Sequence, residues 1–117
     1  MKNNRILALS GNDIFSGGGL SADLATYTLN GLHGFVAVTC LTALTEKGFE
    51  VFPTDDAIFQ HELDSLCDVE FAGIKIGLLP TVSVAEKALD FIKQRPGVPV
   101  VLDPVLVCKE THDVAVS

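Results

Sequence analysis

The sequence is poor in basic residues. It has 8 Lys and Arg against 15 Asp and Glu, which gives a formal net charge of −7. Nucleic acids and anionic membrane surfaces select for clustered Lys and Arg, so neither is expected as the main partner. A small anionic ligand remains compatible with this charge, because backbone N–H groups can hold it.

Cysteine is also scarce. The 3 cysteines have no metal or redox spacing, and an odd number without a signal peptide fits a reducing cytoplasm. The start "MKNNRILALSGND" contains no long apolar core of a signal peptide, and no apolar run is long enough to cross a bilayer. We therefore expect a cytoplasmic protein without membrane contact, with Cys40 and Cys67 as small core residues.

Two common nucleotide-binding motifs are missing. The sequence contains neither G-x-G-x-x-G nor G-x-x-x-x-G-K-S/T, so a dinucleotide fingerprint and a Walker A loop are both unsupported. The 117 residues fit one domain at most, and a hydrophobic content of 48% is sufficient for a packed core.

The sequence does contain an alternation of apolar strands and amphipathic helices. Strands are predicted at residues 6–9, 35–44, 50–52, 71–79 and 98–102. Between them, apolar residues recur at helical spacing and predict helices at residues 20–29, 55–67 and 83–95. The last helix is expected to start with a capping box of Ser83 and Glu86 and to bury Ala85, Ala88, Leu89 and Ile92. This order predicts an α/β fold with a largely parallel sheet and helices on its faces.

In such sheets ligands bind beyond the carboxyl ends of the strands. The first strand is followed by Gly11, Asn12, Asp13 and the triplet Gly17–Gly19. Two interpretations fit this segment: a loop whose bare backbone closes on a ligand, and a tight turn that needs positive φ.

Charged residues near the other strand ends also suggest chemistry. Asp103 follows an apolar strand, where a carboxylate either holds Mg²⁺ directly or through water, or caps a turn before Pro104. Lys109 either meets a phosphate or lies on the surface. Lys75 stands inside the apolar stretch "GIKIG", and we expect it to pair with a carboxylate rather than to act in catalysis.

Three motifs occur in order: "SGNDIFSGGGLSADL", "IKIGLLP" and "VVLDPVLVCK". Together they resemble the vitamin-kinase branch of the ribokinase-like superfamily, which includes hydroxymethylpyrimidine (phosphate) kinases and bacterial pyridoxal kinases. The first family motif is G-S-D-x-S-G-G-A-G-I-Q-A-D-L, and this chain departs from it at Asn12, Phe15, Ser16, Gly18 and Ser21. The resemblance implies a three-layer α/β/α ribokinase-like fold.

The resemblance also implies site roles. Gly11, Gly18, Asn12, Thr42, Leu44 and Leu78 would surround a flat heterocyclic substrate. Asp103 would lie near Mg²⁺ and the phosphates of ATP, directly or through water, while Lys109 and Asp113 would lie near the nucleotide. The implied reaction is transfer of a phosphoryl group from ATP to the hydroxymethyl group of the heterocycle.

A B6 vitamer (pyridoxal, pyridoxine or pyridoxamine) is the expected substrate, because Leu44 stands where pyrimidine kinases carry Gln. The alternative is a hydroxymethylpyrimidine (phosphate) kinase of thiamine biosynthesis. Family members have a C-terminal half with the anion hole and the catalytic residue, so residues 1–117 are expected to be the N-terminal part of a single kinase domain. This part is expected to be inactive alone, and the kinase to be a homodimer. A non-catalytic remnant that binds a heterocycle or a partner is the alternative from another class.

Overall fold

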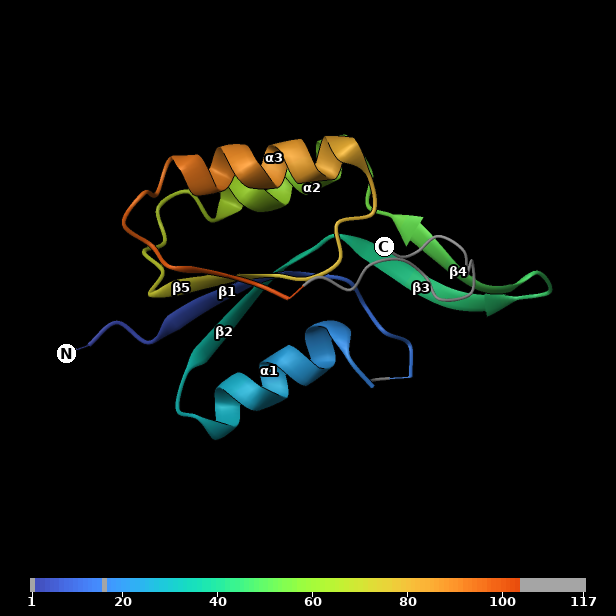
Figure 1. Cartoon of the computed structure of the whole chain (residues 1–117), viewed down its shortest axis with the longest axis horizontal. Helices are drawn as coiled ribbons and strands as arrows, with labels where there is room; N and C mark the ends of the chain where they lie inside the picture. The colour runs from blue at the N-terminus through green and yellow to red at the C-terminus, as the bar shows by residue number, and fades with distance from the viewer. Residues whose placement is uncertain (1, 16, 104–117) are drawn as a thin grey trace.

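The computed structural model describes residues 2–15 and 17–103 of the chain (Figure 1). The predicted residues Lys109 and Asp113 therefore lie outside the described part. In chain order the elements are β1 (Arg5–Ser10), α1 (Gly19–Leu29), β2 (His33–Val38), β3 (Cys40–Thr45), β4 (Gly48–Pro53), α2 (Asp56–Ser65), β5 (Gly73–Ile76), α3 (Val82–Lys93) and β6 (Val100–Leu102).

Four strands form one sheet in the order β2-β1-β5-β6, and every neighbouring pair is parallel. Helix α1 covers one face of this sheet, whereas α2 and α3 cover the other (Figure 1). The prediction of a three-layer α/β/α fold with a parallel sheet is confirmed.

The hydrophobic core lies between the sheet and the helices α2 and α3. Alternation along the strands builds it, because side chains at every second position point to the same face. Leu7 and Leu9 of β1 are fully buried there beside Ile74 of β5, and Phe59 of α2 is fully buried against them. The opposite face must accept α1, and Gly34 of β2 provides the room, since a Cβ at this position would overlap the side chains of Leu24 and Tyr27.

The single strand predicted at residues 35–44 is wrong. The chain leaves the parallel sheet after Val38, and β3 then pairs with β4 in a separate antiparallel hairpin. Side chains satisfy the peptide groups at the crossing point: Val38 N donates to Glu62 Oε1, and Thr54 Oγ1 donates to Val38 O at 2.7 Å. A continuous β-branched run carries no signal for such a change of partner. The short strand predicted at residues 50–52 is confirmed as part of β4.

The ends of the helices follow the sequence in part. Helix α1 ends at Leu29, as predicted, with Asn30 as its C-cap, and the following Gly31 adopts a positive φ of 73°. The capping box predicted at Ser83 is wrong, because Thr81 is the N-cap of α3 and accepts a hydrogen bond from Val84 N at 3.1 Å. Consequently the inward face of α3 is made by Val84, Ala88 and Phe91.

Two apolar residues are more exposed than predicted. Leu89 of α3 is 50% exposed, because the buried stripe is displaced from the predicted one. Cys67 is an exposed free thiol after α2, whereas Cys40 is buried as predicted.

Candidate functional site

A pocket of about 580 Å³ lies at the carboxyl end of the sheet. The β3–β4 hairpin extends beyond this end and forms one side of the region (Figure 1). The lining residues come from β1, the loop of residues 11–15 and 17–19 (here the glycine loop), α1, the hairpin, β5 and the segments after β5 and β6. They are Ser10, Gly11, Asn12, Asp13, Phe15, Gly17, Gly18, Gly19, Ala22, Asp23, Cys40, Thr42, Phe49, Val51, Lys75, Gly77, Leu78 and Asp103.

The glycines of the glycine loop have two different functions. Gly19 has a φ of 62°, and a Cβ there would overlap the carbonyl oxygen of Gly11. A Cβ on Gly11 would in turn overlap Cys40 Sγ. For Gly17 and Gly18, by contrast, the nearest atom to such a Cβ is a carboxylate oxygen of Asp13, at 3.5 and 3.8 Å. The tight-turn interpretation therefore holds at Gly19, whereas Gly17 and Gly18 leave open backbone at the pocket.

Thr42 fixes the glycine loop to the hairpin. Its hydroxyl donates to Asn12 O at 2.8 Å and accepts from Ile14 N at 3.2 Å. A backbone bond from Asn12 N to Cys40 O at 3.0 Å adds a second connection. The loop and the hairpin thus form two connected sides of the pocket.

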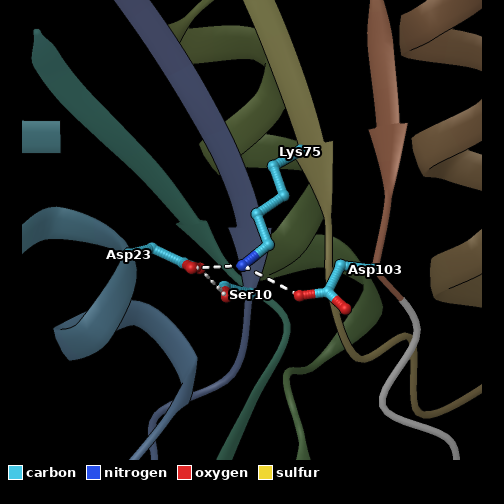
Figure 2. Close-up of polar contacts among 4 residues, drawn as sticks. All are labelled: Ser10, Asp23, Lys75 and Asp103. Atoms are coloured by element: carbon cyan, nitrogen blue, oxygen red, sulfur yellow. Dashed lines mark hydrogen bonds and ion pairs between the residues drawn. The ribbon is translucent and has the colours of Figure 1, made fainter. Parts of the chain in front are cut away.

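A charged cluster lies beside the pocket at the ends of β1, β5 and β6 (Figure 2). Lys75 donates to Asp23 Oδ1, and Ser10 Oγ donates to Asp23 Oδ2 at 2.8 Å. The Lys75 ammonium also lies 3.3 Å from Asp103 Oδ2. Asp23 is nearly buried, with an 8% exposed side chain, whereas the Asp103 side chain is 66% exposed. Lys75 therefore links a structural carboxylate to one that solvent can reach.

The electrostatics of this cluster favour a charged lysine. Burial alone would lower the pKa of Lys75, but the hydrogen bond and charge of Asp23 together with those of Asp103 raise it above its ordinary value. Tyr27 lies near the same charges, and burial followed by the charge of Asp23 raises the pKa of its phenol. The predicted pairing of Lys75 with a carboxylate is confirmed.

The Asp103 carboxylate fits the role of a protein ligand to Mg²⁺ at a site where phosphate oxygens and water would supply most of the other ligands. Its exposed carboxylate is accessible from the pocket, while both oxygens of Asp23 already accept hydrogen bonds. Within residues 2–15 and 17–103, no group of three or more His, Cys, Asp and Glu side chains could hold a metal ion. Mg²⁺ commonly takes one or two carboxylates together with substrate phosphates, and the exposed Asp103 carboxylate suits that arrangement.

The structure brings most of the predicted site residues together. Gly11, Asn12, Gly18, Thr42, Leu78 and Asp103 all line the pocket. Leu44 does not; it is 61% exposed on β3 opposite Phe49, whose ring does line the pocket.

Sequence reasoning missed Ser10, Asp23, Phe49 and Val51 as lining residues. A usable signal existed in part for Asp23, since a lysine inside an apolar strand requires a carboxylate nearby, and Asp23 lies in α1, the helix that follows β1.

The sequence and the structure were compared with known proteins. The model of the family described as phosphomethylpyrimidine kinase matches residues 13–117. The chain belongs to this family. Pyridoxine kinase of Bacillus subtilis (strain 168) is 33% identical over 118 residues, a match that covers 97% of this chain and 44% of that protein. The hydroxymethylpyrimidine/phosphomethylpyrimidine kinase of Haemophilus influenzae is 34% identical over 107 residues, covering 90% of this chain and 40% of its own length.

A solved structure of a pyridoxal kinase is similar to this chain in its fold. Pyridoxal kinase from Staphylococcus aureus, in complex with AMP-PCP, matches with a TM-score of 0.83 and 28% identity, over 94% of this chain and 41% of that protein. This likeness confirms the ribokinase-like fold. The chain spans less than half the length of the curated relatives described above.

Proposed function

We propose that this chain supplies the substrate-binding part of an ATP-dependent kinase that phosphorylates the hydroxymethyl group of a B6 vitamer. The observation that carries the proposal is the composition of the pocket. Apolar side chains of the hairpin, Phe49 and Val51, line it together with the charged groups Lys75 and Asp103. A flat heterocycle with a hydroxymethyl arm suits such a site, because the ring needs apolar contacts and the transferred phosphate needs charged groups.

Each lining residue has a role in this proposal. Gly11, Asn12, Gly18 and Thr42 surround the ring, and Leu78 gives it an apolar contact. Asp103 holds Mg²⁺, directly or through water, next to the phosphates of ATP. Phosphoryl transfer needs mainly positioning and neutralisation of charge from the protein, and the groups named here provide both.

The proposal extends to features outside the described residues. Lys109 and Asp113 would contact ATP. The chain would be the N-terminal part of one kinase domain, in a cytoplasmic homodimer. Among the residues that the structure describes, no helix is long and apolar enough to span a membrane.

Known structures of relatives support ATP and a vitamer as ligands. Structures of the S. aureus pyridoxal kinase are complexes with AMP-PCP, with ADP and with pyridoxal, and each has a TM-score of 0.83 to this chain. The pyridoxine kinase of B. subtilis matches nearly the whole chain.

A hydroxymethylpyrimidine (phosphate) kinase is the second candidate, favoured by the match to the H. influenzae enzyme. Leu44 is the residue proposed to distinguish the two substrates. It shares a face of β3 with Thr42, so a ligand that extends from the pocket along the hairpin could reach it. An amide there would pair with the amino group and ring nitrogen of a pyrimidine, whereas leucine leaves these groups unpaired.

Calorimetric titration of the purified chain with pyridoxine, pyridoxal and hydroxymethylpyrimidine tests the proposal. We expect saturable binding of a B6 vitamer, tighter than that of the pyrimidine, and a shift of the ratio toward the pyrimidine by at least about 5-fold in Leu44→Gln. Tighter binding of the pyrimidine by the wild type would favour the second candidate. Binding of no heterocycle would refute both and leave a remnant that associates with a partner.

A further inference from the structure

Phe15 is an exposed aromatic residue at the pocket. It lies in the glycine loop, is 67% exposed, and is one of the residues that line the pocket. A phenyl ring in water loses the free energy that its burial would provide, so an exposed ring beside a cavity indicates a contact surface for a ligand.

The backbone that carries Phe15 is held in place. Phe15 N donates to Asp13 Oδ1 at 3.0 Å, and the preceding Ile14 N donates to Thr42 Oγ1 at 3.2 Å. The loop therefore keeps this ring near the pocket while leaving its surface uncovered. Holding the backbone lowers the entropy cost of a contact with a bound molecule.

Apolar side chains from the hairpin line the same pocket. Phe49 and Val51 are half-buried lining residues of β4. The glycine loop and the hairpin are joined through Thr42, so Phe15 and Phe49 belong to two connected sides of one cavity. Aromatic rings favour offset or edge contacts with other flat rings, which suits a planar ligand between these sides.

We propose that Phe15 packs its ring on the pyridine ring of a bound B6 vitamer and so contributes to specificity for flat aromatic substrates. This inference rests on the proposed function, because it needs the vitamer in this pocket. The free chain does not depend on the contact, because the ring is exposed without ligand.

The test compares substitutions of Phe15 in the purified 117-residue chain. Pyridoxine binding is measured by calorimetry for the wild type, Phe15→Ser, Phe15→Leu and Phe15→Tyr. We expect Phe15→Ser to weaken binding roughly 5- to 30-fold and Phe15→Tyr to stay within about 2-fold. Phe15→Leu keeps apolar volume without an aromatic face, so it should lie between them. Phe52→Ser is the matched control, because Phe52 is 44% exposed on β4 but is not a lining residue.

Further measurements separate the possible outcomes. Thermal unfolding of the free Phe15→Ser chain should match the wild type within about 2 °C, because the ring is exposed. Equal binding by Phe15→Ser and the wild type would overturn the inference and leave the proposed function intact. Equal binding by Phe15→Leu would overturn the aromatic contact. A wild-type chain that binds no vitamer would overturn both proposals.

Two other results would also count against the inference. A large drop in the unfolding temperature of Phe15→Ser would mean that the ring stabilises the fold. Dissociation of an oligomer by the same substitution, measured by sedimentation, would assign Phe15 to a contact between copies of the chain.

Discussion

The two faces of the parallel sheet differ in chemistry although the same strands make both. Toward α2 and α3 the strands present Leu7, Leu9 and Ile74, which are buried in a continuous apolar core. Toward α1 they present Ser10 and Lys75, which bond to Asp23 (Figure 2). Alternation along a strand assigns neighbouring residues to opposite faces, so one short segment can serve stability and a binding site at once.

The largest expected effect concerns catalysis by the sheet face toward α1, which carries the pocket. We expect the steady-state turnover of purified residues 1–117 with ATP, Mg²⁺ and pyridoxine to be at least about 10³-fold lower than that of the B. subtilis relative. The physical reason is that, under the proposed function, the groups that stabilise the transferring phosphate are expected in the part of the relatives that this chain does not match. Turnover comparable to that of the relative, in protein free of host kinases, would contradict this prediction and would mean that residues 1–117 are sufficient for catalysis.

Among the variants that test stability, changes on the sheet face toward α2 and α3 should have the largest effect. Phe59→Ala removes a fully buried ring of α2 and should lower the free energy of unfolding by about 3–5 kcal/mol. Chemical denaturation measures the change, and Ile58→Ala, at a neighbouring position that is 56% exposed, is the control with an expected loss of less than about 1 kcal/mol. Similar losses from both variants would mean that this face does not hold the core.

The sheet face toward α1 should contribute less to the free energy of unfolding, through the pairing of Lys75 with Asp23. Lys75→Met leaves the nearly buried carboxylate of Asp23 without its cation and should lower the free energy of unfolding by about 1–3 kcal/mol. This loss is smaller than for a fully buried ion pair, because the lysine side chain is 26% exposed and solvent screens the charges. Adding Asp23→Asn to Lys75→Met should recover part of the loss. The exposed Lys93→Met is the control.

The pH dependence of this pair follows from the raised pKa of Lys75. A folded pKa above the ordinary value of 10.5 means that the stabilisation is fully present below that pH and is lost as the pH rises through the folded value. The stability difference between the wild type and Lys75→Met should therefore persist from pH 7 to pH 9. A loss of this difference within that range would contradict the assignment.

The smallest expected effect concerns Glu62 at the crossing from β2 to β3. Burial raises the pKa of this carboxyl, although the hydrogen bond from Val38 N opposes the shift. A raised pKa of a carboxyl means that protonation favours the folded state, so stability relative to Glu62→Gln should improve as the pH falls from 7 to 5. The change should stay below about 1 kcal/mol, measured by urea denaturation at both values. A relative loss over this range would contradict the direction of the shift.

The sequence predicted the alternating elements because buried strands and amphipathic helices have distinct periods. The break after Val38 could not be predicted, since the peptide groups there are satisfied by side chains from residues far along the chain, Glu62 and Thr54. The same dependence on long-range contacts explains which residues of the site could be predicted. Gly11, Asn12 and Asp103 follow strands directly and were found, whereas Phe49 reaches the pocket only because the hairpin folds beside it.

Strand β6 has a consequence for how the isolated chain behaves in solution. Within the described part of the chain it pairs only with β5, and Val100, Val101 and Leu102 are 40%, 61% and 65% exposed. An apolar strand with an open edge is a template for pairing with other chains. Concentrated preparations of these 117 residues should therefore self-associate, and a lysine in place of Val101 should raise their solubility.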